Sequence, residues 1–272
     1  MRKYSPTSPG RRQAEIVDTS ALSRTEPYKP LTVGRKRAVG RNAFGRITMR
    51  HRGGGVKRLF RLIDFRYDKR NVPAVVEAIE YDPNRTAWIA LVRYADGERR
   101  YVLAPQGWKR GSRFLVSESA SVEVGNRLPL EKIPVGASVF NVELIPGKGA
   151  KLIRSAGAGA QVLAVEGGYA TLKLPSGEVR MVRSGNWATI GSLSNPERSF
   201  MTWGKAGRMR LRGIRPTVRA SAMNPREHSY GGGEGRAPRG TRRPKTMWGK
   251  VTGGVKTRKK KRSDRFILQR RK

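Results

Sequence analysis

The side chains most able to do chemistry lie in one short stretch, MNPREHSYGGGEGR at residues 223–236. It contains His228, one of two histidines in the chain, beside Glu227 and Ser229 and close to Ser221. A histidine next to a carboxylate or a hydroxyl group can act as a general base. Adjacent loop residues are poor partners for one another, however, and no G-x-S-x-G elbow or complete phosphate loop accompanies them. His228 is therefore a weak catalytic candidate, and the alternative is a histidine that hydrogen-bonds or stacks within a loop.

The residue types of the chain exclude several other kinds of site. There is no cysteine, which removes disulfides, thiol catalysis and cysteine-based zinc sites. His51 and His228 are 177 residues apart in the sequence, so we expect no metal site built on histidine. The stretch GGGEGR lacks the G-x-G-x-x-G spacing of a dinucleotide site. We expect no cofactor.

The charge of the chain points to a polyanionic partner. Its 272 residues include 58 Lys and Arg against 20 Asp and Glu, a net charge of +38, and such an excess repels itself unless an anion is bound. No apolar run approaches the roughly 18–20 residues of a spanning helix. The N-terminus lacks the apolar core of a signal peptide, and the basic stretches are too rich in Gly and Pro for an amphipathic membrane helix. Nucleic acid is the expected partner, and we expect neither a membrane nor a homo-oligomer.

The elements that must position these residues differ between the middle and the ends. Residues 61–199 have a net charge of +6, whereas residues 1–60 have +12 and residues 200–272 have +20. The two ends mix Arg with Gly and Pro and have few apolar residues to bury, so we expect them to be ordered by a partner. We therefore predict a basic N-terminal extension over 1–60 and a basic Gly/Arg-rich C-terminal extension over 200–272.

The middle has the pattern of small β domains. RYADGERRYV places Asp96-Gly97 between two strand-like runs, which indicates a hairpin. In TLKLPSGEVRMV the apolar Leu172 alternates with polar neighbours, and after the Ser-Gly turn Val179 and Met181 flank Arg180; this period of two predicts a half-buried antiparallel pair. The prolines of LPLEKIPVGASVFNV indicate a connection near 128–134. We predict a mainly β fold with two small barrels or sandwiches in tandem.

The chemistry of the basic ends fits RNA. Lys and Arg bind phosphates, Arg also stacks on splayed bases, and neighbouring glycines let the backbone approach a phosphate chain. The candidates are Arg35, Lys36, Arg37, Arg41, Arg46, Arg50, His51, Arg52, Lys57, Arg58, Lys205, Arg208, Arg210, Arg212, Arg215, Arg219, Gly231, Gly232, Gly233, Arg236, Arg239, Arg242, Arg243, Lys250, Lys259, Lys260, Lys261 and Arg262. Trp203 and Trp248 lie in this basic sequence and are candidates for stacking, whereas Trp108 and Trp187 are expected to pack in the barrels.

Other readings of the charge remain open. A protein that compacts DNA or another nucleic acid, or a transcription factor, would also be strongly basic. The sequence has no recognition helix, zinc motif or basic zipper, and this argues against a sequence-specific DNA-binding protein. Long basic arms around compact β domains suit an irregularly folded RNA. Mg²⁺ associated with that RNA, rather than held by the chain alone, is the one metal ion left open.

Four long motifs in colinear order resemble one known family. They are GRNAFGRITMRHRGGGVKRLFRLIDF (40–65), EYDPNRTAWIALVRYADGERRYVLAP (80–105), GAKLIRSAGAGAQ (149–161) and AMNPREHSYGGGEGRAP (222–238). Nearly the whole chain is similar to the universal ribosomal protein number two of the large subunit, in its bacterial form. The resemblance implies a non-enzymatic protein, located in the cytoplasm within the ribosome, that binds large-subunit rRNA of the 23S type.

The resemblance also implies an architecture and a set of roles. It implies an oligonucleotide/oligosaccharide-binding (OB) barrel over 61–128 and an SH3-like barrel over 129–199, with both extensions embedded in rRNA. The protein would support the peptidyl-transferase region, tRNA binding and subunit association, at a bridge to the small subunit and beside other ribosomal proteins. Arg85 and Arg154 match RNA-contacting positions at the mouth between the barrels. His228 matches a histidine once proposed to act in peptide-bond formation, a role that stays as the alternative.

Two positions depart from the pattern of the family. Where the family usually has proline after the histidine and then His or Phe, this chain has Ser229 and Tyr230. The missing proline removes a fixed φ and adds a backbone donor, while Tyr230 keeps a ring that is expected to contact RNA. Val56 stands where the family often has histidine, so a role for histidine there does not transfer.

Overall fold

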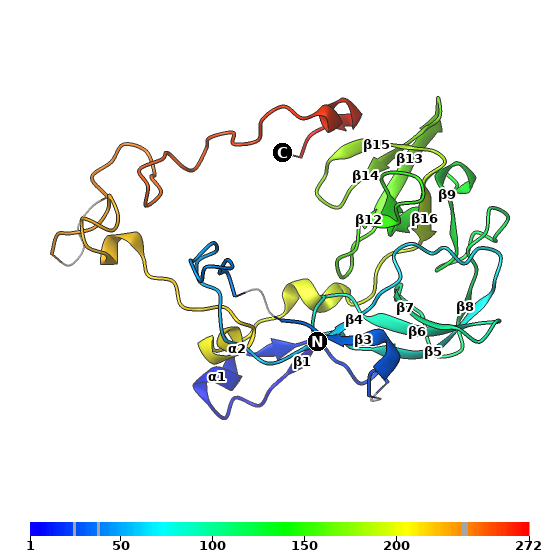
Figure 1. The fold of residues 1–272 in the computed structure, drawn as a ribbon, viewed down its shortest axis with the longest axis horizontal. Helices are drawn as coiled ribbons and strands as arrows, with labels where there is room; N and C mark the ends of the chain where they lie inside the picture. The colour runs from blue at the N-terminus through cyan, green and yellow to red at the C-terminus, as the bar shows by residue number, and fades with distance from the viewer. Residues whose placement is uncertain (24–25, 37–38, 235–238, 272) are drawn as a thin grey trace. The chain divides into compact units, whose positions relative to one another are not determined.

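The structure is a computed structural model that describes residues 1–23, 26–36, 39–234 and 239–271 (Figure 1). The chain forms two units. Unit 1 consists of Met1–Arg37, Lys57–Arg208 and Arg265–Lys272, and unit 2 of Ala38–Val56 and Met209–Asp264. The chain therefore leaves unit 1 twice and returns to it twice. The domain limits predicted above stay a prediction.

The smaller sheet of unit 1 is an antiparallel meander with one added strand. Its strand order is β7-β6-β5-β8, formed by β5 (Ala74–Glu80), β6 (Ile89–Tyr94), β7 (Arg99–Leu103) and β8 (Arg113–Phe114). The predicted hairpin at Asp96-Gly97 is confirmed. Tyr94 N–H donates to Glu98 O, Gly97 N–H donates to Tyr94 O, and Gly97 has a φ of 87°. A three-residue turn that ends in a left-handed glycine is a common hairpin connection.

The larger sheet of unit 1 has the strand order β17-β15-β14-β13-β10-β16-β9. Its strands are β9 (Arg127–Pro129), β10 (Ser138–Phe140), β13 (Ala160–Glu166), β14 (Tyr169–Lys173), β15 (Val179–Arg183), β16 (Trp187–Ile190) and β17 (Ile267–Gln269). The chain thus changes sheets between Phe114 and Arg127. Strand β17 returns from the far end of the chain and pairs antiparallel with β15, so it covers an edge of the sheet.

The strand pair predicted in TLKLPSGEVRMV forms as β14 and β15, but β15 turns the opposite face to the core from the one predicted. Leu172 of β14 pairs with Arg180 of β15, and Ala170 pairs with Val182. Directly paired residues share a face of the sheet, so Val182 is buried with Leu172, whereas Met181 is only half-buried. The alternation around Arg180 predicts that Val179 and Met181 face the core, and this was wrong. Val182, on the other face, is apolar too, and the register with β14 places it on the side of Leu172.

The remaining elements are short, and the predicted mainly β class is confirmed. The other strands are β1 (Arg2–Lys3) with β2 (Glu15–Ile16), β3 (Thr32–Gly34) with β4 (Leu59–Arg61), and β11 (Val142–Glu143) with β12 (Ala150–Leu152). The helical turns are α1 (Pro9–Arg12), α2 (Ala206–Leu211), η1 (Lys29–Leu31), η2 (Leu130–Lys132), η3 (Pro196–Phe200), η4 (Ala220–Ala222) and η5 (Arg262–Phe266). The two curled sheets are consistent with an OB-like barrel and an SH3-like barrel.

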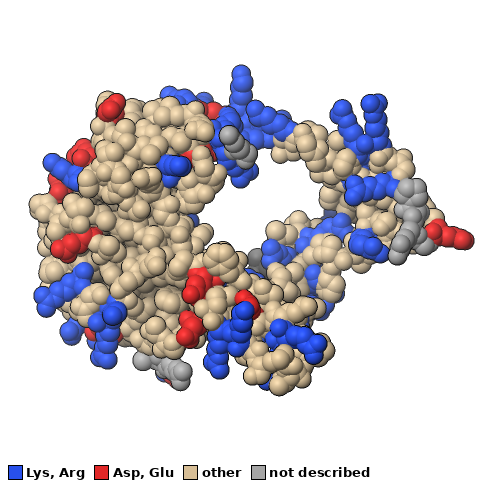
Figure 2. Space-filling view, turned by 180° about the vertical axis from the view of Figure 1, so that it is seen from behind, with Lys and Arg blue, Asp and Glu red and all other residues tan. Residues whose placement is uncertain are grey.

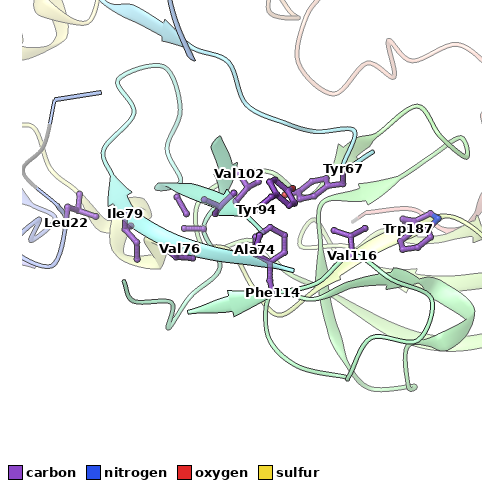
Figure 3. Close-up of a cluster of buried hydrophobic side chains, with 13 residues drawn as sticks. Leu22, Tyr67, Ala74, Val76, Ile79, Tyr94, Val102, Phe114, Val116 and Trp187 are labelled. Carbon is purple, nitrogen blue, oxygen red and sulfur yellow. The ribbon is translucent and has the colours of Figure 1, made fainter. Parts of the chain in front are cut away.

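The apolar cores hold the two sheets of unit 1 together. One cluster, drawn in Figure 3, combines Val76, Tyr94 and Phe114 of the smaller sheet with Trp187 of β16. A second cluster joins residues of β6 and β7 to Phe140 of β10. Each large apolar side chain that is fully buried contributes roughly 1.5–3 kcal/mol. The predicted packing of Trp187 and Trp108 is confirmed, Trp187 being buried and Trp108 partly buried against the first cluster.

A buried polar network crosses the same junction. The Arg127 guanidinium donates to Glu143 Oε1 at 3.0 Å and to Asn141 O at 2.8 Å. Its guanidinium carbon lies 4.6 Å from the centre of the Tyr67 ring, and Asn141 Nδ2 donates to the Tyr67 hydroxyl at 3.0 Å. Burial raises the pKa of Tyr67 to about 12, against the opposing charge of Arg127. Removing either Arg127 or Glu143 would leave the other's charge buried without a partner, so this ion pair fixes how the two sheets pack.

Candidate nucleic-acid interface

The basic side chains are most concentrated in unit 2. That unit contains 21 Lys and Arg against 3 Asp and Glu, and unit 1 contains 37 against 17. On the face drawn in Figure 2, Lys and Arg side chains lie both over the body and along the segments that extend from it, whereas Asp and Glu lie mostly over the body. The acidic side chains of unit 1 are also used internally. Arg100, for example, forms ion pairs with Asp64, Asp68 and Glu98.

The two basic arms, far apart in sequence, lie side by side within unit 2. Residues 51–56 run antiparallel to residues 211–216. Arg215 N–H donates to His51 O at 3.1 Å, Gly53 N–H to Gly213 O at 3.1 Å, and Val56 N–H to Leu211 O at 2.9 Å. Two candidates from the N-terminal arm, Arg50 and Arg52, therefore share one ribbon with Arg212 and Arg215 from the C-terminal arm. We call residues 50–56 and 211–216 the arm ribbon.

His51 is part of the backbone architecture of this ribbon. Its φ of 58° lies in the left-handed region, which few residues other than glycine adopt. The ring nitrogen Nδ1 lies 2.9 Å from Pro216 O, and a carbonyl can only accept, so Nδ1 carries the hydrogen. The imidazole thus fixes the C-terminal arm against the N-terminal one.

His228, the histidine of the opening stretch, is buried within its own loop. Tyr230 N–H donates to His228 Nδ1 at 3.1 Å, which places the hydrogen of the neutral ring on Nε2. The His228 and Tyr230 rings lie 4.7 Å apart between centres. Glu227 Oε2 accepts from Asn224 N–H at 3.3 Å, and so its carboxylate caps the start of the turn. The described contacts of Glu227 and His228 thus hold the loop in shape.

The glycines after His228 are needed for a reason that the sequence alone does not reveal. A Cβ on Gly231 would lie 2.1 Å from Asn224 O, and a Cβ on Gly232 would lie 2.8 Å from Pro225 Cγ. Gly232 and Gly233 also have left-handed φ values of 84° and 83°. Gly231 and Gly232 are thus required by the packing of the loop on itself, independently of any approach by RNA.

Tyr230 connects this loop to the next segment of the chain. Its hydroxyl accepts from Lys245 N–H, and the Arg239 guanidinium carbon lies 5.9 Å from the ring centre. Partial burial raises the pKa of Tyr230, but hydrogen bonds from Lys245 and Thr241 and the nearby cations outweigh it, and the pKa is lower than usual. Close by, Arg242, Arg243 and Lys245 line a hollow of about 530 Å³. The loop thus presents several cations around one aromatic ring.

The structure brings Arg85 and Arg154 together. Their guanidinium carbons lie 5.8 Å and 4.6 Å from the centre of the same Phe65 ring. Arg85 is also paired with the buried Asp82, while Arg154 is exposed and donates to Ala150 O at 3.4 Å. Arg85, which comes after β5, and Arg154, which comes after β12, thus contact one aromatic ring. We call Phe65 with these two arginines the Phe65 platform.

The backbone next to this platform is strained. Ile153 has a φ of 57°, a conformation that a β-branched residue adopts at a cost of roughly 1–3 kcal/mol. Its carbonyl accepts from Asn141 N–H at 3.1 Å, and a Cβ on Gly149 would lie 2.6 Å from Phe65 O. Such strain concentrates at functional sites, and here it directs the chain that carries Arg154.

Several other candidates of unit 1 rest on aromatic rings or carbonyls. Arg35 lies 5.4 Å from the Phe60 ring centre, and Arg58 donates to Pro83 O at 3.0 Å. Trp203 is half-buried beneath Arg198, at 5.0 Å from its ring centre, and its carbonyl accepts from Arg208 at 3.1 Å. Trp203 therefore packs within the protein, and its predicted stacking on RNA stays a prediction.

The remaining candidates lie apart from these groups. The exposed ones are Lys36, Arg41, Arg46, Lys57, Lys205, Arg210, Arg219, Gly233, Trp248, Lys250, Lys259, Lys260, Lys261 and Arg262. The candidates Arg37 and Arg236 lie outside the described residues. Over the residues that the structure describes, no group of three or more His, Asp and Glu side chains could hold a metal ion. In the same part of the chain no helix is long and apolar enough to cross a membrane.

Comparison with known families gives two matches in the order of the chain. Residues 28–116 match the RNA-binding N-terminal domain of ribosomal proteins L2. Residues 123–249 match the C-terminal domain of ribosomal proteins L2. The first match contains the smaller sheet and Arg85, and the second contains Arg154, the His228 loop and most of the larger sheet.

Proposed function

Because the chain belongs to the ribosomal protein L2 family of large-subunit RNA-binding proteins, we propose that it binds 23S-type rRNA through the arm ribbon and the Phe65 platform. The proteins of this family are part of the ribosome in the cytoplasm. The observation that carries the proposal is the pairing of the two basic arms, by which arginines more than 150 residues apart in the sequence come to lie on one ribbon. We further propose that the chain is not an enzyme.

The chemistry of the ribbon suits a folded RNA. A two-stranded segment with left-handed His51, Gly53 and Gly54 is irregular and narrow, and glycines along it let the backbone come close to phosphates. Arginine forks bind phosphate oxygens in pairs. At the platform, Arg85 and Arg154 are held by a ring, which reduces the entropy lost when they bind.

The finer roles are also part of the proposal. We propose that RNA held in this way supports the peptidyl-transferase region, tRNA binding and the association of the subunits at a bridge to the small subunit, next to other ribosomal proteins. The position of His228 inside its loop supports a positioning role, since its Nδ1 accepts from Tyr230 and its carbonyl accepts from Gly231 N–H at 2.8 Å.

The salt dependence of binding tests the proposal. Each phosphate that a side chain neutralises contributes about 0.7–0.9 to the slope of log K against log salt. The chain with both Arg52→Gln and Arg215→Gln should bind large-subunit rRNA with a slope lower by roughly 1.4–1.8. A titration of labelled rRNA at several salt concentrations measures it.

Arg93→Gln is the matched control. Arg93 lies on β6 and forms an ion pair with Glu77 at 3.3 Å, so its replacement should leave the slope unchanged. An affinity that barely changes with salt in the unaltered chain would overturn the proposal, and so would equal slopes for the double variant and the control.

A further inference from the structure

Two segments of unit 2 share a sequence pattern that the function above does not explain. Residues 41–48 read RNAFGRIT and residues 245–252 read KTMWGKVT. In both, a basic residue is followed by Asn or Thr, one variable residue, an aromatic residue, glycine, a second basic residue, a β-branched residue and threonine. The two copies are about 200 residues apart in the sequence.

The first segment forms a tight hairpin. Arg41 bridges to Ile47, Asn42 N–H donates to Arg46 O at 3.0 Å, and Gly45 N–H donates to Asn42 O at 3.1 Å. Gly45 has a φ of 74°, as the last position of a three-residue hairpin turn requires. The Arg41 guanidinium also donates to Gly45 O at 2.9 Å, which holds this cation at the turn.

The second segment forms the same hairpin. Lys245 bridges to Val251, Thr246 N–H donates to Lys250 O at 2.8 Å, and Gly249 N–H donates to Thr246 O at 2.9 Å. Gly249 has a φ of 75°. The pattern in the sequence therefore specifies one fold twice, with an aromatic residue at the same position of each turn.

The aromatic residue distinguishes these hairpins from others with the same turn. In unit 1, the turns that end at Gly97 and Gly177 have the same two hydrogen bonds, and the position before the glycine is occupied by Asp96 and by Ser176. A polar residue suits a tip that faces water. In unit 2 the equivalent residues are Phe44, with 89% of its surface exposed, and Trp248, with 72%.

Large exposed rings between two cations fit a nucleic acid. We propose that both hairpins are copies of one RNA-binding element, in which Phe44 and Trp248 stack on unpaired bases. Base stacking on an aromatic ring is tolerant of sequence. Arg41 and Arg46 in one copy, and their lysine equivalents in the other, bind the phosphates on either side of the stacked base. This inference rests on the proposed function, since it names residues by which the chain would bind rRNA.

Leucine and aromatic replacements in the full-length chain test the element, with full-length large-subunit rRNA as the probe. Phe44→Leu and Trp248→Leu should each weaken binding by roughly 5- to 150-fold, as expected for the loss of one stacked base. The slope of log K against log salt should stay the same, because no charge is removed. Phe44→Trp and Trp248→Phe should retain the affinity, whereas Arg46→Gln should lower the slope by about 0.7–0.9.

Phe200→Leu is the matched control, since Phe200 is 73% exposed but lies at the end of η3 rather than at a hairpin tip. Full affinity in both leucine variants, together with steep salt dependence, would overturn this inference and leave the proposed function standing. Loss of affinity in the aromatic replacements as well would also overturn it.

If the unaltered chain shows no salt-dependent binding, the proposed function itself fails. A defect that appears only in assembled subunits, and not with naked rRNA, would place the rings against protein and overturn the inference.

Discussion

At the scale of single residues, Glu77 and Glu80 of β5 show how neighbours set the properties of a carboxyl group. Arg99 donates to the two oxygens of Glu77 at 2.7 Å and 3.2 Å, and this guanidinium holds the pKa of Glu77 below its ordinary value. Glu80 is buried, and burial raises its pKa, against the hydrogen bond from the Tyr101 hydroxyl at 2.8 Å and the charge of Arg61. The two shifts have opposite signs.

These signs predict opposite pH dependences for two variants. The folded chain binds a proton at Glu80 more tightly than the unfolded chain, so this group destabilises the fold as pH rises above about 4.5. Glu80→Gln should therefore gain stability relative to the unaltered chain as pH rises from 4.5 towards neutrality. The stability from Glu77 is present above 4.5 and is lost as pH falls through its lowered pKa. Glu77→Gln should thus be less stable near pH 7 and match the unaltered chain in acid.

Urea unfolding between about pH 3 and pH 7 measures both differences. The two variants remove the same charge from the same strand, so each is the control for the other. Parallel pH profiles would contradict the prediction and would show that overall charge, rather than the local surroundings, governs the stability.

At the scale of elements, the loop around His228 is held by contacts that its neighbours supply. We expect His228→Ala to slow peptide-bond formation less than tenfold in large subunits that have incorporated the variant. Loss of a general base costs about 10²- to 10⁴-fold. Tyr230→Phe, which removes the acceptor for Lys245 N–H, should give a similar mild defect, because both changes loosen one loop. Single-turnover assays on purified subunits measure it.

A different result would favour direct chemistry. A loss of many orders of magnitude with His228→Ala, with normal assembly and tRNA binding and no defect in Tyr230→Phe, would assign the reaction to the imidazole. Glu227→Gln offers a further control, because its oxygen that accepts from Asn224 N–H is retained in the amide.

Local elements were predictable where a turn fixes them. The Asp96-Gly97 hairpin follows from turn chemistry that acts over five residues, and so do its strands. The inward face of β15 was not predictable, because Val179, Met181 and Val182 are all apolar and only the pairing with β14 decides among them. The repeated hairpin was readable from the sequence. Its signal was an aromatic residue before Gly45 and Gly249, between two cations.

Contacts across long sequence separations could not be predicted from residue patterns. Nothing in the residues around Arg52 indicates that they pair with those around Ile214, and the convergence of Arg85 and Arg154 on Phe65 depends on how the two sheets pack. The resemblance to the family supplied Arg85 and Arg154 as candidates, but Phe65 and the strained Ile153 appear only in the structure.

At the scale of the whole molecule, the division of charge predicts how a fragment behaves. Residues 61–199 hold most strands of both sheets, so we expect them to fold cooperatively and to bind rRNA with a smaller salt slope than the full chain. They lack Leu22 of the first core cluster, Tyr28, whose N–H donates to the Tyr101 hydroxyl at 2.9 Å, and β17. Their melting temperature should therefore be lower than that of the full chain.

Circular dichroism on heating and salt titrations of rRNA binding test the fragment. The full-length chain is the reference in both. A fragment without a cooperative transition would contradict the two-barrel domains, and a salt slope equal to that of the full chain would contradict the role given to the arms.

Strand β17 gives the C-terminal extension a property that a dangling tail lacks. The chain leaves unit 1 after Arg208 and is bound to it again where Ile267 pairs with Arg180. Residues 209–264 thus form a loop that is tied at both ends, so part of its conformational entropy is lost before it binds RNA. The entropic cost of closing such a loop rises by only about 0.6 kcal/mol when its length doubles. Ordering this loop on RNA would therefore cost less conformational entropy than ordering a free tail of the same length. The affinity for RNA would then depend on the edge of a β-sheet as well as on the number of phosphates bound.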